Sequence, residues 1–403
     1  MTFLRALHHR PFALLWTGQT ISRLGDSLYR IALAWWVLEE TGSAEAMGTV
    51  LLFAFAPMLF FLLIGGVVVD RLPRLRVMFA ADLINGAVVG LLGFLAAAGR
   101  LRVEHVYAAS AVFGLAEAFF FPAYTASIPQ IVPPESLPSA NSLTSLSWQL
   151  SGIVGPALGA GVVAAAGAPA AFALDSVSFF VSAMFLVPIL RLLAAPRGSQ
   201  AKPSGLADMR QGLSLVLSTP WLWVSIGVFA FINVTDAGPR NVALPFLVHD
   251  RLGMEVDALG LVSGITAAGS VLSAIYLGRK QRLRRRGLLA YGGVIVGGLM
   301  LMVYGLAPSI VWLAAAAVIY GMAFSATGLV WTNTLQAMVP AEALGRVSSI
   351  DALGSFVLLP LGFYAAGVLT DIYGASLTFL LGGAVTIVLA LLALSHPGVR
   401  RLD

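Results

Sequence analysis

The first long apolar segment of the chain, residues 12–38, carries polar side chains at regular intervals. Gln19, Arg23, Asp26 and Arg30 all fall on one face of a helix, because each is three or four residues from the next. A charge at the bilayer centre costs at least about 2.5–3.5 kcal/mol, so such residues usually face a bundle interior or a watery cavity. The stripe therefore indicates a site or path across a membrane. The alternative is an internal Asp26–Arg30 pair that only stabilises the helix.

The composition of the chain is that of a membrane protein. Of its 403 residues, 59% are hydrophobic and 11% are charged, whereas soluble domains are roughly 25% charged. The mean hydropathy is +0.90. The apolar runs are long and continuous, which predicts helices rather than the short alternating strands of a barrel. The expected fold class is therefore an all-α polytopic membrane protein.

Other chemistries find little support in the sequence. The absence of cysteine excludes disulfides, thiolate metal sites and thiol redox chemistry. The five His residues fall in predicted loops or tails, so no metal cluster is expected. No Gly-rich loop followed by Lys-Ser or Lys-Thr is present, which argues against an ATP-driven pump. We expect no enzyme activity, no metal and no cofactor.

Twelve apolar runs predict twelve transmembrane helices. They span residues 12–38, 45–69, 76–98, 104–128, 139–166, 169–191, 221–248, 257–278, 287–307, 309–332, 346–370 and 375–395. The longest polar connection follows the sixth run. We therefore expect an N-terminal six-helix bundle at residues 1–192, a cytoplasmic linker at 193–219 and a C-terminal six-helix bundle at 220–403.

Basic residues are distributed unevenly over the predicted loops. With both termini in the cytoplasm, 18 of the 24 Lys and Arg residues lie on the cytoplasmic side and three on the other side, as the positive-inside rule requires. The basic run at 279–286 then anchors a loop near anionic lipid headgroups, and nucleic acid is not an expected partner. The expected location is the cytoplasmic (inner) membrane of a prokaryote.

The two predicted bundles repeat each other. At an offset of 207 residues the matches include Gly114 with Gly321, Pro133 with Pro340, Glu135 with Glu342, and Gly167 with Gly374. At an offset of 210, Asp26 and Arg30 match Asp236 and Arg240, so D-x-x-x-R occurs in the first span of each half. A duplicated, pseudo-symmetric six-helix unit is typical of transporters in which two bundles rock about a site near the bilayer midplane.

The connection between the second and third spans carries a family resemblance. Residues 65–76 read GGVVVDRLPRLR and are similar to the pattern G-x-x-x-D-R-x-x-R-R, with Gly66, Asp70, Arg71 and Arg74 in place and Arg76 one residue after the position of the last Arg. On this signature the chain resembles the major facilitator superfamily over essentially its whole length. The resemblance implies the major facilitator fold, usually a monomer, in which this loop is a cytoplasmic gate for alternating access.

The fifth span extends the resemblance. Residues 151–160 read SGIVGPALGA and resemble the exporter-type signature G-x-x-x-G-P-x-x-G-G at Gly155, Pro156 and Gly159, with Gly152 and Gly161 close by and Ala160 in place of the last Gly. Small residues let helices pack closely and Pro bends a span; a generic packing face is the alternative. The chain also resembles the branch of siderophore (enterobactin-type) and macrolide exporters, through residues 22–37, 41–44, 134–143 and 343–349.

Acidic residues within the spans are the candidates for proton coupling, because a buried carboxyl group can take up a proton at working pH. Asp26, Glu117 and Asp236 lie near the centres of the first, fourth and seventh spans. The alternative is that neighbouring arginines hold them in ion pairs. The fourth span lacks the Arg that many drug–proton antiporters of the superfamily carry there, so a mechanism based on that Arg is not carried over.

Three other acids in or near spans receive different interpretations. Asp82 is expected to be shallow and to face the cytoplasm. Asp175 and Asp351 lie in the first third of their spans and are expected to be structural, capping or bridging helices near a membrane face.

Polar and aromatic side chains within the spans, several of them spaced about one helical turn apart, are expected to line a substrate cavity. The candidates are Gln19, Arg23, Arg30, Tyr124, Asn141, Ser145, Gln149, Asn233, Arg240, Tyr320 and Trp331. Aromatic groups with a few polar ones suit a large amphipathic ligand. The alternative is that many of the aromatic residues face lipid or the core.

Together these features predict a secondary active exporter of amphipathic small molecules, drug-like or siderophore-like. Alternating access coupled to the antiport of protons would supply the driving force. The alternatives are an importer or symporter on the same fold, a lipid or lysolipid flippase, and a membrane receptor or assembly factor without flux. The expected partners are the small substrate and membrane lipid. The charge of the substrate stays open, because mid-span acids and arginines are balanced.

Overall fold

All regular structure in the computed structural model is helical over the residues it describes, which are 4–192, 206–278 and 284–402. Within these ranges it leaves out the side chains at 63, 64, 66–68, 70, 71, 192, 206–209, 278 and 341. Ten stretches of the described chain are long and apolar enough to cross a membrane. One of them, Pro134–Arg191, holds two helices on either side of Gly167, and helix α1 adds another. The prediction of twelve membrane helices is thereby confirmed.

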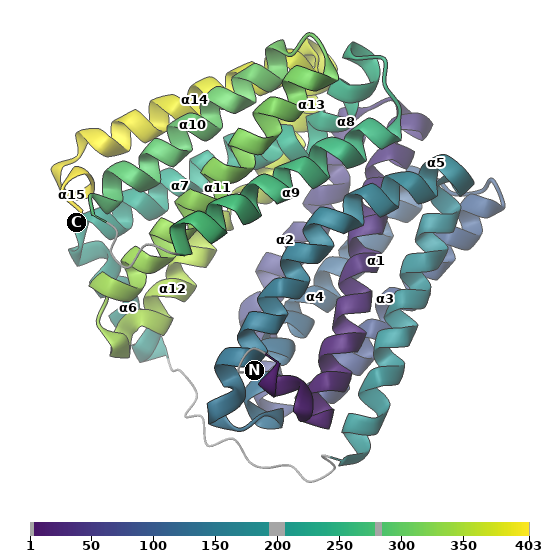
Figure 1. The fold of residues 1–403 in the computed structure, drawn as a ribbon, viewed down its shortest axis with the longest axis horizontal. Coiled ribbons are helices and arrows are strands. Elements are labelled where there is room, and N and C mark those ends of the chain that lie inside the picture. Colours follow the sequence, from purple (N-terminus) through teal and green to yellow (C-terminus); the bar gives the residue numbers. More distant parts are fainter. Residues whose placement is uncertain (1–3, 193–205, 279–283, 403) are drawn as a thin grey trace. The chain divides into compact units, whose positions relative to one another are not determined.

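The chain forms two compact units (Figure 1). The first comprises Met1–Gly42 and Phe53–Lys202, and the second Ser43–Leu52 and Pro203–Asp403. The elements up to residue 192 are η1 (Arg5–His8), α1 (Arg10–Thr41), α2 (Ala44–Arg71), α3 (Arg74–Ala97), α4 (Val103–Ile131), η2 (Pro134–Ser136) and α5 (Leu137–Leu192). The following elements are α6 (Leu206–Ser218), α7 (Pro220–Gly238), η3 (Pro239–Ala243), α8 (Leu244–Phe246), η4 (Leu247–Arg251), α9 (Val256–Gly278), α10 (Arg286–Leu306), α11 (Ile310–Met338), α12 (Ala341–Phe356), α13 (Leu359–Tyr373), α14 (Ala375–Ser395) and α15 (Pro397–Arg400).

The predicted linker has helical structure in part. Residues 206–218 form α6, whereas residues 193–205 lie outside the described chain. The predicted domain boundaries at 192 and 220 stay a prediction.

The sequence repeat reappears in the backbone at two glycines. Gly167, inside α5, has φ 76° and ψ 170°, and its counterpart Gly374, between α13 and α14, has φ 83° and ψ 156°. Both lie at positive φ, which glycine adopts without the steric penalty of a Cβ atom. The same break thus separates the fifth helix from the sixth and the eleventh from the twelfth.

A second pair of repeat positions sets how closely helices approach. A Cβ atom on Gly114 of α4 would overlap the backbone carbonyl of Ala54 on α2. A Cβ atom on Gly321 of α11 would overlap the carbonyl of Thr266 on α9 in the same way. The fourth helix of each repeat therefore lies against the second with no room for a side chain.

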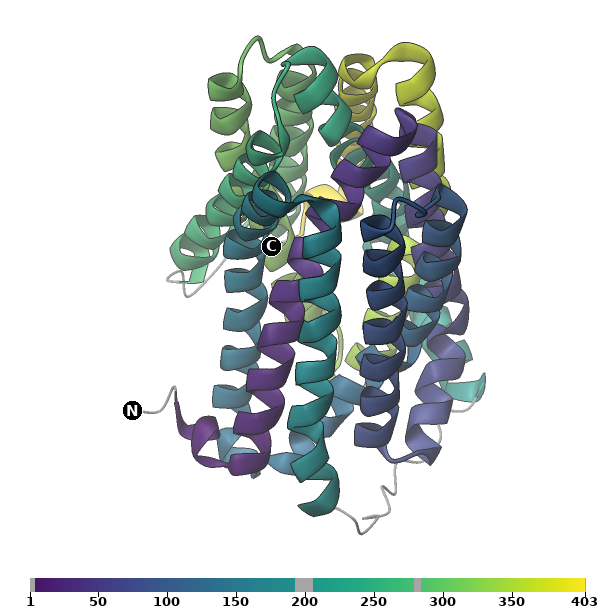
Figure 2. The same cartoon turned by 90° about the vertical axis from the view of Figure 1, so that its right-hand side faces the viewer.

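Helix α5 organises the first unit by packing against both α1 and α3. A Cβ atom on Gly155 would overlap Ser27 of α1, and one on Gly159 would come within 2.9 Å of the Leu28 Cα atom. The later part of α5 runs beside α1 (Figure 2), where a Cβ atom on Gly18 would lie 2.9 Å from the Phe185 Cβ atom. These contacts bring α1 directly against both parts of α5.

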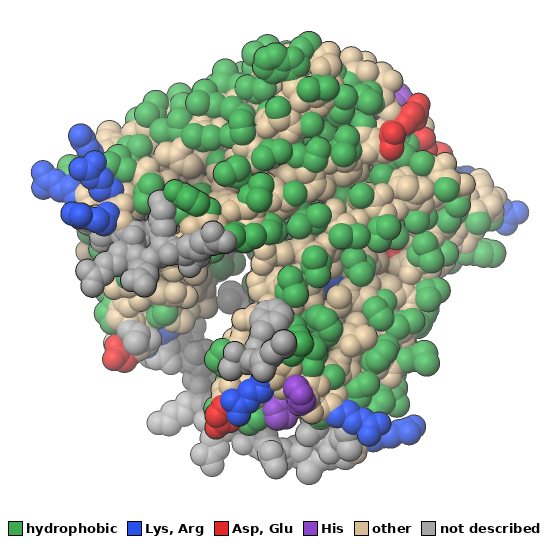
Figure 3. Space-filling model, in the orientation of Figure 1, with side chains coloured by type: hydrophobic (Ala, Val, Ile, Leu, Met, Phe, Trp, Pro, Cys, Tyr) green, Lys and Arg blue, Asp and Glu red, His purple; other side chains and the backbone are tan. Residues whose placement is uncertain are grey.

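Large hydrophobic side chains cover much of the molecular surface. Phe60, Phe94, Met184 and Val311 are each more than two thirds exposed, at 72%, 70%, 71% and 72%. On the face shown in Figure 3, hydrophobic side chains extend across the helices, while most Lys and Arg side chains lie near helix ends. An apolar outer surface of this extent suits contact with lipid.

Substitution of the close-approach glycines tests this packing. We expect Gly114→Ala and Gly321→Ala to lower stability by about 1–3 kcal/mol each, because the added methyl group overlaps backbone. Gly292→Ala is the matched control, since a Cβ atom there meets nothing within 4 Å. The measurement is the thermal unfolding temperature in detergent. Equal unfolding temperatures for Gly321→Ala and Gly292→Ala would contradict the expectation.

Candidate functional site

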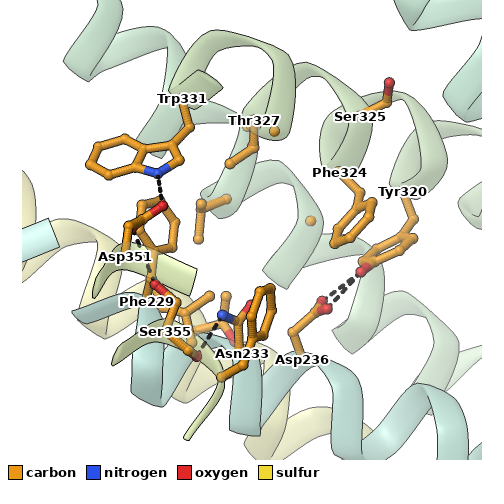
Figure 4. Close-up of a pocket in the computed structure, with 17 residues that line it drawn as sticks. Phe229, Asn233, Asp236, Tyr320, Phe324, Ser325, Thr327, Trp331, Asp351 and Ser355 are labelled. Atoms are coloured by element: carbon orange, nitrogen blue, oxygen red, sulfur yellow. Dashed lines mark hydrogen bonds between the residues drawn. The ribbon is translucent and has the colours of Figure 1, made fainter. Parts of the chain in front are cut away.

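A pocket of about 290 Å³ lies within the second unit, among α7, α10, α11, α12 and α14. Aromatic side chains form much of its wall, and two carboxyl groups, those of Asp236 and Asp351, face it. In the view of Figure 4, the pair of Asp351 and Trp331 lies on one side and the pair of Asp236 and Tyr320 on the other. Its size is near the lower end of the range for small-molecule sites.

The carboxylate of Asp236 accepts hydrogen bonds from one charged and one neutral side chain. Arg240, one turn further along, forms a salt bridge with its carboxylate at 2.8 Å, and the Tyr320 hydroxyl lies 2.7 and 2.8 Å from its two oxygens. The Arg240 guanidinium also sits over the Tyr320 and Phe324 rings, 4.9 and 5.3 Å from their centroids. The ion-pair alternative considered for the predicted proton sites is therefore realised at Asp236.

Asp351 has only neutral donors among the described residues. The Trp331 indole N–H donates to it at 3.0 Å, and the Ser355 hydroxyl lies 3.4 Å away. Asn233 donates to the Ser355 carbonyl at 2.9 Å. The expectation that Asp351 is structural and near a membrane face missed its position in the pocket. One sequence signal could have indicated this position: Asp351 is an acid one helical turn from Ser355 within an apolar span.

Four predicted cavity or proton candidates line this pocket, namely Asn233, Asp236, Tyr320 and Trp331. The predicted Arg240 reaches the site through its ion pair. The sequence interpretation missed Phe229, Phe324 and Ser355, which also line it.

In the first unit, the D-x-x-x-R motif makes different contacts. Arg30 is exposed and donates to the Ser27 hydroxyl at 3.2 Å, and one oxygen of Asp26 is buried without a hydrogen-bond partner among the described residues. Arg23 lies over two aromatic rings, 3.7 Å from the Trp148 centroid and 5.0 Å from the Tyr124 centroid. The same motif is thus a closed ion pair only in the second unit, as far as the described residues show.

The other predicted residues of the first unit are scattered over different environments. Gln19 is buried and donates to Ser182 of α5 at 2.8 Å. Glu117 is half-buried on α4. Asn141, Ser145 and Gln149 are exposed along α5, where the Gln149 amide donates to Ser145 at 3.2 Å.

The side chain of Asp82 lies inside the helix bundle of the first unit, and its predicted position near the cytoplasmic face stays a prediction. Its side chain is 1% exposed, because α3 packs against α5 and the Ser182 hydroxyl donates to the carboxylate at 2.7 Å. Asp175 on α5 is fully buried as well, beside Gly25 of α1.

Comparison with known proteins decides the family. The model of the Major Facilitator Superfamily matches residues 15–362. The chain belongs to this superfamily. It is therefore a multi-pass membrane transporter and not an enzyme.

Three similar proteins of the superfamily are named as efflux proteins or exporters. Macrolide efflux protein A of Streptococcus pyogenes is 25% identical over 398 residues, covering 97% of each chain. The multidrug efflux pump Tap of Mycolicibacterium fortuitum is 27% identical over 405 residues, covering 98% of this chain and 97% of Tap. The enterobactin exporter EntS of Escherichia coli is 25% identical over 368 residues, covering 88% of this chain and 86% of EntS.

Solved structures show the same major facilitator fold. The nucleoside transporter NupG superposes with a TM-score of 0.75 at 12% identity, covering 96% of this chain and 98% of NupG. A bacterial homologue of the iron transporter ferroportin, in its inward-facing state, gives a TM-score of 0.71 at 17% identity, covering 94% and 98%.

The predicted gate of the superfamily lies partly outside the described side chains. The side chains at Gly66, Asp70 and Arg71 are left out, although their backbone is helical. Arg74 donates to the Ala126 carbonyl of α4 at 2.8 Å, and Arg76 is exposed. The role of residues 66–76 as a gate stays a prediction. The exporter-type helix packing expected of Gly152 and Pro156 in α5 stays one as well.

The two D-x-x-x-R motifs predict different costs of substitution. Asp236→Asn should lower stability by about 2–5 kcal/mol, because it leaves Arg240 without its charge partner. Asp26→Asn, which breaks no ion pair in the described part of the chain, should change stability by less than about 1 kcal/mol. Thermal unfolding in detergent measures both. The double variant Asp236→Asn with Arg240→Gln should recover part of the loss; similar losses in the two single variants would contradict the assignment.

Proposed function

We propose that this transporter is a secondary active exporter of amphipathic small molecules, driven by the antiport of protons. The pocket of the second unit carries the proposal, because aromatic walls with two carboxyl groups suit a ligand that is partly apolar and partly polar. The efflux activity named for the three relatives supports the outward direction. The transporter is proposed to act as a monomer.

The proposed membrane is the cytoplasmic (inner) membrane, with both termini in the cytoplasm. Support comes from the 18 to three asymmetry of basic residues over the predicted loops. In this orientation residues 66–76 lie at the cytoplasmic side, where the proposed gate opens and closes as the transporter alternates its access.

Asp26 and Glu117 are the proposed proton carriers. Both are mid-span acids of the first unit that form no salt bridge among the described residues, so neither is hydrogen-bonded to a fixed cation there. Protons entering from outside would neutralise them and promote release of the substrate. Asp236 is a third candidate, but a proton there must compete with Arg240 and Tyr320.

The pocket assignment predicts a specific loss of substrate affinity. Trp331→Ala should raise the KM for efflux of ethidium from proteoliposomes about tenfold or more, because it removes a ring from the pocket wall. Trp312→Ala is the matched control on the same helix, since that side chain is 60% exposed and lies outside the pocket. An equal KM in the two variants would place the substrate elsewhere.

Proton coupling makes a separate prediction. Efflux of ethidium, or of an anionic catecholate, should accelerate under an imposed pH gradient in wild type. It should lose this acceleration in Asp26→Asn or Glu117→Gln, because neither amide can carry the proton. Acceleration unchanged in both variants would remove these residues from the mechanism while leaving export in place. Absence of flux of either compound in wild type would favour the flippase or receptor alternatives.

A further inference from the structure

The pocket of the second unit has a counterpart in the first unit, position by position along the repeat. At the offset of 210 residues, Asn233 corresponds to Arg23, and at the offset of 207, Trp331, Asp351 and Ser355 correspond to Tyr124, Thr144 and Trp148. The structure supports this correspondence, because equivalent positions touch in both units. Trp331 donates to Asp351 at 3.0 Å, and the Tyr124 and Thr144 hydroxyls lie 3.3 Å apart.

In the first unit, this place is filled by a cation of the chain itself. The guanidinium of Arg23 lies 3.7 Å from the centroid of Trp148 and 5.0 Å from that of Tyr124. The side chain is 8% exposed. The site is thus a buried cation between aromatic faces, an arrangement that proteins also use to bind cationic ligands.

In the second unit, the same place lacks the cation. Asn233 stands where the first unit has Arg23, and its short amide turns to the Ser355 carbonyl at 2.9 Å. The pocket of about 290 Å³ is lined by Asn233, Trp331, Asp351 and Ser355. The second unit therefore has an open pocket where the first unit has the guanidinium of Arg23.

The side chains around that space favour positive charge. Trp331, the best of the aromatic residues at binding cations, replaces Tyr124, and the acid Asp351 replaces the neutral Thr144. Asp236 is neutralised by Arg240 at 2.8 Å, whereas Asp351 has no salt bridge among the described residues and receives only neutral donors. The carboxyl group of Asp351 is therefore available to pair with a positively charged ligand.

We propose that the second unit binds the positively charged group of the substrate, an ammonium or guanidinium, where Arg23 lies in the first unit. Trp331 supplies the aromatic face and Asp351 the opposite charge. The inference rests on the proposed export of amphipathic molecules and assigns a charge to them. It favours cations over anionic catecholates, a choice that the balanced charges of the sequence leave open.

Two ions of matched shape and opposite charge test the proposal. Tetraphenylphosphonium and tetraphenylborate are titrated calorimetrically against the full chain in detergent, with protein-free micelles as the blank. We expect wild type to bind the phosphonium, and Asp351→Asn to weaken this binding about tenfold or more, because a desolvated charge pair is lost. Binding of the borate, if any, should not weaken in this variant.

The substitution Asn233→Arg makes the test sharper. It places a guanidinium in the second unit as Arg23 does in the first, so it should abolish binding of the phosphonium and leave the unfolding temperature unchanged or raised. Asn233→Gln is its control, because it also alters the hydrogen bond to Ser355 but adds no charge. Gln should retain most of the binding.

Three results would overturn the proposal. They are no binding of the phosphonium by wild type, undiminished binding in Asp351→Asn, and equal loss in Asn233→Gln and Asn233→Arg. Failure of the proposed export has a different signature. In that case the phosphonium binds with the expected variant pattern, but proteoliposomes show no flux of it.

Discussion

The constraint on which the rest of this structure depends is that charge inside an apolar bundle must be balanced. The second unit balances Asp236 with a salt bridge and a tyrosine hydroxyl. The first unit places Arg23 between aromatic rings and buries Asp82 against a serine hydroxyl. Each arrangement reduces the penalty for removing a charge from water. A charge that is left without a fixed partner can respond more readily to a proton or a substrate.

Duplication kept the backbone of the repeat and changed its side chains. Glycines at equivalent positions form the same breaks and the same close helix contacts in both units. The two D-x-x-x-R motifs have different neighbours. Tyr320 donates to the Asp of the motif in the second unit, whereas Phe113 occupies the equivalent position in the first repeat. Phe113 has no hydroxyl to donate to Asp26. One hydroxyl group thus contributes to the difference between a closed ion pair and an open carboxyl group.

The sequence was sufficient for the features that depend on local pattern. Hydropathy predicted the twelve helices, and matched Gly, Pro, Asp and Arg residues predicted the repeat. Asn233, Asp236, Tyr320 and Trp331 are predicted cavity or proton-coupling residues because they are polar or aromatic side chains within apolar spans, and they do line one pocket.

The remaining features depend on how the helices are rotated against each other, which one sequence does not specify. The burial of Asp82 follows from the face that α3 turns to α5. The place of Asp351 in the pocket follows from the contact of α12 with Trp331 on α11. Spacing alone permitted an Asp26–Arg30 pair, but residues from other helices decide whether such a pair closes.

The described pocket has a consequence for alternating access, because all of its side chains belong to the second unit. A site built on one unit keeps its geometry for as long as that unit moves as a rigid body. Rocking of the units alone would then change the side of the membrane to which the site opens but not its affinity for the ligand. A ligand that binds two states with equal affinity does not shift the equilibrium between them. Coupling therefore requires a second event that changes the charge near the ligand. A proton on a carboxyl group of the pocket would be such an event, and Asp351 lines the pocket without a salt bridge among the described residues.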